Sequence, residues 1–248
     1  MDMEEFYNET KAVALEGFKR LNGTDQVEHK KWDFPAGSWE VNVVRGEVLE
    51  KATISRVRLT VTVPGSGEEM RVDVVQANVY PVSPRIPILL VNMENRVGKE
   101  DSFGGFVDVA PVAACEEDLG FLSAQMKNVA QRHGEDYESR RKGLEKIYKM
   151  AQWEKAVNAA VGIRLEAPRE KFDMVRDAGL EWFRSYSAIA EKRQNESHDK
   201  EDTVLMHSIR ARILEYYLIE DMATGVGIKL GVPLEAMTLS SLPPMVHY

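Results

Sequence analysis

Every second residue is apolar in several segments between residues 41 and 110, and this period limits the folds open to the chain. Val41 and Val43 show the alternation, and Val57, Leu59 and Val61 repeat it. Successive side chains of a strand point to opposite faces, so the spacing predicts strands with one buried face. Further strands are predicted at residues 70–80, 88–91 and 103–109. Their short connections favour an antiparallel meander.

The apolar spacing becomes helical on both sides of this region. The first predicted helix covers residues 3–21 and ends at an Asn-Gly pair. Leu119, Leu122, Met126 and Val129 place a second helix after residue 116. Further helices are predicted at residues 136–152, 168–192 and 203–222.

The remaining segments are predicted to form loops and one further strand in the C-terminal half. Residues 24–38 and 193–202 are predicted loops, and the renewed alternation at 157–165 predicts a strand. No repeat or linker divides the chain, so residues 1–248 are predicted to form one domain. The expected fold class is α+β, a large and mostly antiparallel β-sheet flanked by α-helices.

Composition excludes several classes of protein. With 44% hydrophobic and 29% charged residues, the chain is expected to fold as a soluble globule. A net charge of −8 argues against a nucleic-acid partner. One cysteine, Cys115, and five histidines without metal-ligand spacing argue against a metal site. No signal peptide or membrane span is visible, so a cytoplasmic location is expected.

Four stretches, in order along the chain, resemble oxygen-dependent coproporphyrinogen III oxidases. That family carries a Gly-x-Val-Phe-Glu-Lys-Ala run, a His-Pro-x-Asn-Pro-x-x-Pro segment with a later asparagine, a Phe-Gly-Gly-Gly-x-Asp-Leu-Thr-Pro segment and a C-terminal motif set. The matching residues of the first three stretches are Gly46–Ala52 after Gly37-Ser38-Trp39, Tyr80–Pro87 with Asn92, and Phe103–Pro111. Those of the fourth are Arg210-Ala211-Arg212, Glu215, Asp221, Thr224 and Gly227, with Leu234–Met237 and Ser241–Pro244.

The resemblance implies an oxidative decarboxylation of two propionates of a porphyrinogen to vinyl groups. Dioxygen would be the co-substrate, and no metal or organic cofactor is expected. Asp108 matches the family aspartate that faces the substrate and interacts with pyrrole nitrogens, so it is the candidate catalytic residue. The alternative is a structural aspartate that caps the turn before Pro111. Family members are often homodimers, so a homodimer is expected.

Several positions depart from the family pattern. Tyr80 stands where the family has a histidine, and a phenol is a poorer base at neutral pH. Glu94 and Met222 replace arginines, and residues 153–158 have lost the arginines of the family. Arginine is the natural bidentate partner of the four carboxylates of coproporphyrinogen, so a different substrate is expected. Arg210 and Arg212 are candidates to hold one carboxylate, and the alternative is an exposed basic turn of a helix.

A second likeness is to ferredoxin-dependent bilin reductases, in the segments around Tyr80-Pro81 and Asp108. In a regular strand, Gln76, Asn78 and Tyr80 share one face. With Asn92 they are candidate substrate-binding residues that form a polar wall near Asp108. The alternative is that this face is solvated.

Three functions follow from these likenesses. The first is a tetrapyrrole-modifying enzyme similar to coproporphyrinogen oxidase, which would place the chain in porphyrin and haem biosynthesis. The second is a bilin reductase-like enzyme with a ferredoxin partner. The third is a tetrapyrrole-binding protein without catalysis.

Overall fold

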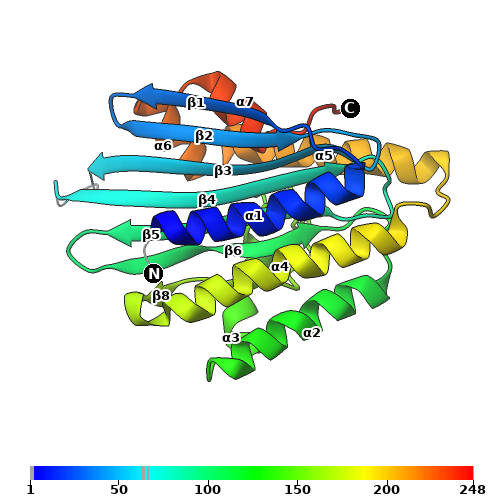
Figure 1. Ribbon diagram of the computed structural model, residues 1–248, viewed down its shortest axis with the longest axis horizontal. Helices are drawn as coiled ribbons and strands as arrows, with labels where there is room; N and C mark the ends of the chain where they lie inside the picture. The colour runs from blue at the N-terminus through cyan, green and yellow to red at the C-terminus, as the bar shows by residue number, and fades with distance from the viewer. Residues whose placement is uncertain (1–2, 63–64, 66, 248) are drawn as a thin grey trace.

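The alternating segments form one antiparallel sheet in the computed structural model, which describes residues 3–62, 65 and 67–247 (Figure 1). Each of the first seven strands pairs with its sequence neighbour, and the short β8 pairs with β6. The strands are β1 (Glu28–Phe34), β2 (Gly37–Val44), β3 (Leu49–Thr62), β4 (Glu69–Pro81), β5 (Ile88–Val97), β6 (Ser102–Ala110), β7 (Ile163–Arg164) and β8 (Ala167–Pro168). The predicted α+β class and antiparallel meander are therefore confirmed.

Three long helices cover one face of the sheet. They are α1 (Met3–Asn22), α2 (Glu116–Arg132) and α4 (Phe172–Arg193), and α1 and α4 lie in front of the strands in Figure 1. The buried rings of Phe6, Phe18 and Trp182 belong to this core, with the apolar side chains of β4 and β5 that face them. The short α3 (Tyr137–Arg141) packs against α2 and β7.

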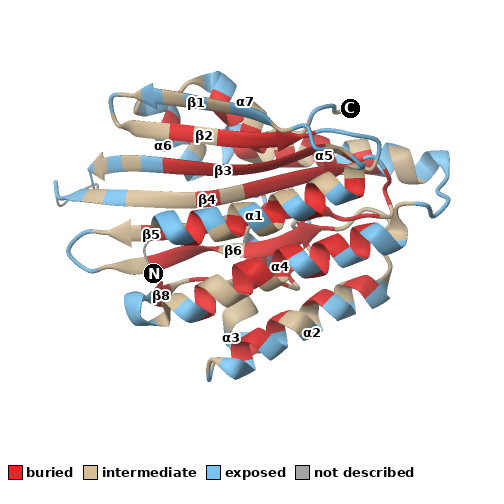
Figure 2. Ribbon diagram, in the orientation of Figure 1, coloured by how far each residue is buried: buried red, intermediate tan, exposed pale blue. Residues whose placement is uncertain are grey.

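The C-terminal helices cover the opposite face of the sheet. They are α5 (Lys200–Ile219), α6 (Met222–Lys229) and α7 (Leu234–Ser241). Here the buried residues fall into two smaller clusters, one around Tyr80 and Tyr217 and the other around Trp39 and Met237. Burial is densest where the strands lie between the two helical layers (Figure 2). Within the described residues, no helix combines the length and hydropathy needed to cross a bilayer.

The structure corrects several predicted elements. Residues 28–34 form the edge strand β1 rather than a loop. Their alternation is hidden by lysines and acidic residues, which are common on edge strands. The helix predicted at 136–152 is reduced to α3 and a 3₁₀ turn at Leu144–Lys146. The last helix ends at Ile219, and α6 and α7 were not predicted.

The glycines of the Phe103–Pro111 motif allow β5 and β6 to approach closely. Gly105 has φ of +90°, and a Cβ atom there would lie 2.0 Å from the carbonyl oxygen of Asn92. A side chain at this position would collide with the backbone of β5, so the motif requires glycine for a steric reason.

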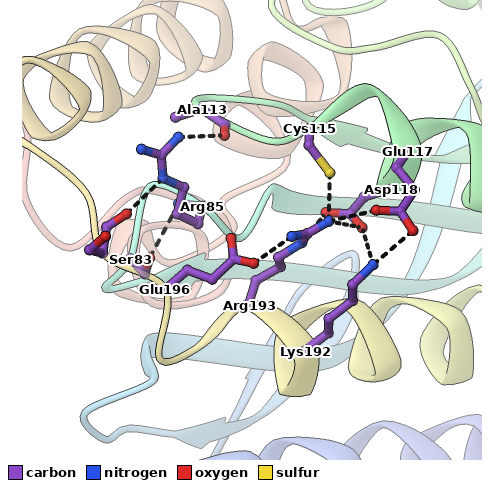
Figure 3. A network of polar contacts seen from close by, with 10 residues as sticks. Ser83, Arg85, Ala113, Cys115, Glu117, Asp118, Lys192, Arg193 and Glu196 are labelled. Atoms are coloured by element: carbon purple, nitrogen blue, oxygen red, sulfur yellow. Dashed lines mark hydrogen bonds and ion pairs between the residues drawn. The ribbon is translucent and has the colours of Figure 1, made fainter.

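A polar network centred on the buried Asp118 ties the start of α2 to the end of α4 (Figure 3). Arg193 donates from Nε to Oδ2 of Asp118 at 2.7 Å and from Nη2 to Oδ1 at 3.0 Å. It also contacts the Sγ atom of Cys115. The Asp118 side chain is 3% exposed and that of Arg193 is 11% exposed. This ion pair therefore holds two helices in register on the face away from α5–α7.

Candidate functional site

Two adjoining cavities form a groove between the sheet and helices α5 to α7. The cavities share Gln76, Asn92, Tyr217, Asp221 and Ala223 as lining residues. The combined groove extends across the sheet from Trp39 on β2 to Phe106 on β6. Neighbouring strands lie about 4.8 Å apart, so the groove crosses roughly 19 Å of sheet. The groove therefore extends across five neighbouring strands of the sheet.

The groove is mostly apolar, and its few charged side chains are acidic. Its polar floor comes from Gln76 on β4 and from Asn92 and Glu94 on β5. Asp221 supplies a second carboxylate from the start of α6. Among the described residues that line the groove, there is no arginine, lysine or histidine. The site thus offers hydrogen-bond acceptors rather than cationic groups.

Asn92 and Glu94 form a fixed pair on β5. Asn92 donates from Nδ2 to Oε1 of Glu94 at 2.9 Å, and Arg96 donates from Nε to Oε2 of Glu94 at 2.9 Å. Because the carboxylate accepts, the Asn92 amide must present its nitrogen to Glu94 and its oxygen elsewhere. That Oδ1 atom is buried and has no hydrogen-bond partner among the described residues. The groove wall therefore contains an unsatisfied acceptor.

Asp221 has a structural role as well as its place in the groove. Its Oδ2 atom accepts hydrogen bonds from the backbone nitrogen of Thr224 at 2.8 Å and from its hydroxyl at 2.7 Å. These contacts cap α6, which covers the groove.

Asp108 is fully buried and anchors the loop that follows α3. Its Oδ2 atom accepts from Nδ2 of Asn158 at 2.7 Å and from the backbone nitrogen of Ala160 at 2.9 Å. Its Oδ1 atom accepts from the nitrogens of Val161 and Gly162, both at 3.2 Å. Burial raises the pKa of this carboxyl, and the hydrogen bonds from Asn158 and the backbone oppose the shift.

The substrate-facing role expected for Asp108 stays a prediction, and the structure shows where the residue lies. It is not among the residues that line the groove, and Leu90 separates it from Asn78 in the sheet. Its contacts also explain the short β7. Residues 158–162 turn their backbone nitrogens toward the carboxylate instead of pairing as a strand, so only Ile163–Arg164 joins the sheet.

Tyr80 and Asn78 hold the C-terminal segment instead of lining the groove. The Tyr80 hydroxyl donates to the carbonyl of Ser241 at 2.5 Å. Asn78 accepts from the hydroxyl of Tyr217 at 3.1 Å and donates to the carbonyl of Ser240 at 3.4 Å. Gln76, Asn78 and Tyr80 do share one face of β4 as predicted, but only Gln76 reaches the groove.

Arg210 and Arg212 also make internal contacts. Arg210 is buried, and it donates to Glu50 at 2.7 Å and to the carbonyl of Pro81 at 2.7 Å. The alternative of an exposed helix turn is therefore wrong for Arg210. Arg212 lies 4.4 Å from the ring centre of Trp153 and donates to the carbonyl of Lys155 at 2.8 Å. Neither guanidinium is part of the groove lining.

Residues 2–248 match the family model of coproporphyrinogen III oxidase. The chain belongs to the coproporphyrinogen III oxidase family. It is 26% identical over 224 residues to the oxygen-dependent coproporphyrinogen-III oxidase of Francisella philomiragia subsp. philomiragia, covering 82% of this chain and 72% of the relative. The oxidase of Francisella tularensis subsp. novicida is 24% identical with the same coverage.

The fold is also similar to that of a bilin reductase. The crystal structure of phytochromobilin synthase from tomato, in complex with biliverdin, superposes with a TM-score of 0.61 at 11% sequence identity. The match covers 94% of this chain and 81% of the tomato protein. The sequence match thus shows the family of the chain, and the likeness to the tomato protein shows a shared fold.

The groove also contains Glu94, Tyr217 and Asp221, which were not predicted as site residues, although Asp221 belongs to the C-terminal stretch that resembles the family. Glu94 was noted only as a lost arginine, although its spacing from Asn92 places both on the same face of β5. Tyr217 and Asp221 lie where α5 ends and α6 begins. Their place in the groove depends on α6, whose glycines gave no helical signal in the sequence.

Proposed function

We propose that this protein binds a tetrapyrrole in the groove and modifies it. The observation that carries the proposal is the groove itself, an apolar slot across β2 to β6 with amide and carboxylate groups at its centre. Apolar walls fit a planar ring system, and a few polar groups fix its orientation. Membership of the coproporphyrinogen III oxidase family supports this ligand class.

The reaction is proposed to be a variant of the family activity with a changed substrate. Oxidative decarboxylation of a porphyrinogen with dioxygen needs partners for the propionates, and the groove lining has no cationic side chain. The carboxylate of Asp108, which matches the family catalytic residue, accepts four hydrogen bonds from the side chain of Asn158 and from backbone nitrogens. The second candidate is a bilin reductase-like activity with a ferredoxin, which the fold of phytochromobilin synthase favours.

Spectroscopy of the purified protein tests the proposal. The protein is mixed separately with coproporphyrinogen III, haem and biliverdin, with reduced ferredoxin added to half of the biliverdin samples. Oxygen-dependent porphyrin fluorescence above the protein-free rate supports the first reaction. A ferredoxin-dependent change of bilin colour supports the second. A spectral shift without turnover indicates a binding protein, and no shift with any compound would contradict the proposal.

A pair of matched variants locates the binding. Gln76→Leu replaces a polar residue of the groove floor, and Gln131→Leu makes the same change at an exposed position of α2, on the other side of the sheet. We expect Gln76→Leu to weaken binding by about tenfold through loss of a buried hydrogen bond. Gln131→Leu should bind as the wild type does. Equal affinities in both variants would place the ligand elsewhere.

A further inference from the structure

The charged side chains of the groove are acidic, and several of its donor groups, such as the hydroxyls of Tyr217 and Thr224 and the amide of Asn92, are already bonded within the protein. Glu94, Asp221 and Asn92 lie in its lining, and the Oδ1 atom of Asn92 is buried there without a hydrogen-bond partner among the described residues. An ionised carboxylate has about four acceptor positions, and Glu94 uses three of them for Asn92 and Arg96. One position on its Oε1 atom is therefore left beside the unsatisfied oxygen of Asn92.

Acceptors in an apolar site call for donors on the ligand. A buried amide oxygen without a partner costs free energy, and a ligand N–H group would remove that cost. A carboxylate of the ligand would meet the opposite situation, because it is itself only an acceptor and would face Glu94 and Asp221 at low local dielectric. The groove should therefore attract the pyrrole N–H groups at the centre of a tetrapyrrole and repel carboxylates at its edge.

The nearest guanidinium does not reverse this preference. Arg96 is bonded to Glu94 through Nε and Nη2 and does not line the groove. The neighbouring Arg164 is likewise paired with Glu166. Both cations are thus already neutralised by a carboxylate two residues away on the same strand or its extension.

We propose that Asn92 and Glu94 bind pyrrole N–H groups of the ligand and that the groove selects a pyrrolic ring with few or no free carboxylates. This inference rests on the proposed function and narrows its substrate class. It gives Glu94 the contact with the ring nitrogens that the resemblance assigned to Asp108.

A matched pair of probes separates ring recognition from charge. Coproporphyrin III carries four carboxylates, and its tetramethyl ester has the same ring with none. Each is titrated against the protein, with the same small fraction of dimethyl sulfoxide, and ring fluorescence is followed. We expect the ester to bind wild-type protein about tenfold or more tightly than the tetra-acid, because of like-charge repulsion in the groove.

Three variants complete the test. Glu94→Gln should weaken binding of the ester and strengthen binding of the tetra-acid. The ratio of ester affinity to tetra-acid affinity should therefore fall by about tenfold. Asn92→Ala should weaken both, because it removes a neutral acceptor. Glu166→Gln is the matched control, since Glu166 accepts from Nε of Arg164 at 2.9 Å, as Glu94 does from Arg96, but lies outside the groove lining.

The outcomes separate this inference from the proposed function. If both compounds bind and the tetra-acid binds as tightly as the ester, the charge selection is wrong. If Asn92→Ala leaves both affinities unchanged, or if Glu166→Gln changes the ratio as much as Glu94→Gln does, the assignment of the N–H site is wrong. If neither compound binds to wild-type protein, this inference is wrong, and if haem and biliverdin do not bind either, the proposed function is contradicted as well.

Discussion

The carboxylate of Asp108 and the side-chain amide of Asn158 meet at 2.7 Å in the interior of the protein. The two residues come from β6 and from the loop that replaces a predicted strand. Asp108, the aspartate of the family motif, thus makes buried hydrogen bonds that stabilise the fold. Its replacement should lower the stability of the protein before it affects ligand binding.

Asp108→Asn is expected to destabilise the protein. The asparagine amide would turn an NH₂ group toward donors that now bond to the carboxylate, so at least one buried hydrogen bond is lost. We expect a loss of about 2–4 kcal/mol in the free energy of unfolding. Urea denaturation measures this cost. Ligand binding by the remaining folded protein should be close to normal. If the variant is as stable as the wild type but no longer binds ligand, Asp108 contacts the ligand directly.

The Asp118–Arg193 pair gives a prediction for acid stability. Burial alone would raise the pKa of Asp118, but hydrogen bonds from Arg193 and Cys115 hold that pKa below its ordinary value. A lowered folded pKa means that the stabilisation is present above the unfolded pKa, near 3.9, and is lost as pH falls through the folded pKa.

Asp118→Asn should therefore lower the urea midpoint at pH 7 and have a much smaller effect near pH 2–3. Asp25→Asn is the control, because Asp25 is paired with Lys19 but its side chain is 97% exposed. An equal penalty for Asp118→Asn at both pH values would contradict the assignment.

Lys51 gives a prediction in the opposite pH range. It is 2% exposed and donates to the carbonyls of Leu239 at 3.0 Å, Thr238 at 3.3 Å and Leu242, at the end of α7. Burial, with the nearby charges of Arg45 and Arg210, lowers its pKa to about 7. Between that pKa and the unfolded value near 10.4, the unfolded chain binds more protons, so stability should rise with pH from 7 to 9.

Lys51→Met should remove this rise and loosen α7, because three carbonyl groups lose their donor. Thermal unfolding at pH 7, 8 and 9 compares the wild type with this variant. Lys149→Met, at an exposed position of the chain, should keep the wild-type slope. A slope that persists in Lys51→Met must come from other groups.

Gly105→Ala tests the close approach of β5 and β6. The added Cβ would lie 2.0 Å from the Asn92 carbonyl oxygen at a φ of +90°, so we expect a loss of at least about 2 kcal/mol in stability. Gly120→Ala on exposed α2 meets nothing within 4 Å and should stabilise by about 0.5–1 kcal/mol. Calorimetry of both variants checks the contrast.

The sequence predicted what depends on local pattern and missed what depends on distant partners. Alternation located β3 to β6, and the shared face of Gln76 and Asn78 followed from it. The loop at 158–162 alternates too, but the tertiary contacts to Asp108 override that preference. The burial of Arg210 could not be predicted, because its partners, Glu50 and Pro81, lie far away in the sequence.

The two walls of the groove come from different parts of the sequence, the sheet from the N-terminal half and the helices from the C-terminal residues. β1 to β6 each pair with a sequence neighbour, so the sheet can assemble through short loop closures. The opposing wall, residues 217–242, depends on long-range contacts such as that of Tyr80 with Ser241. Local opening of α6 and α7 would expose the cleft while leaving the sheet intact. Amide hydrogen exchange should accordingly show bound ligand slowing these helices most, with little change in the central strands.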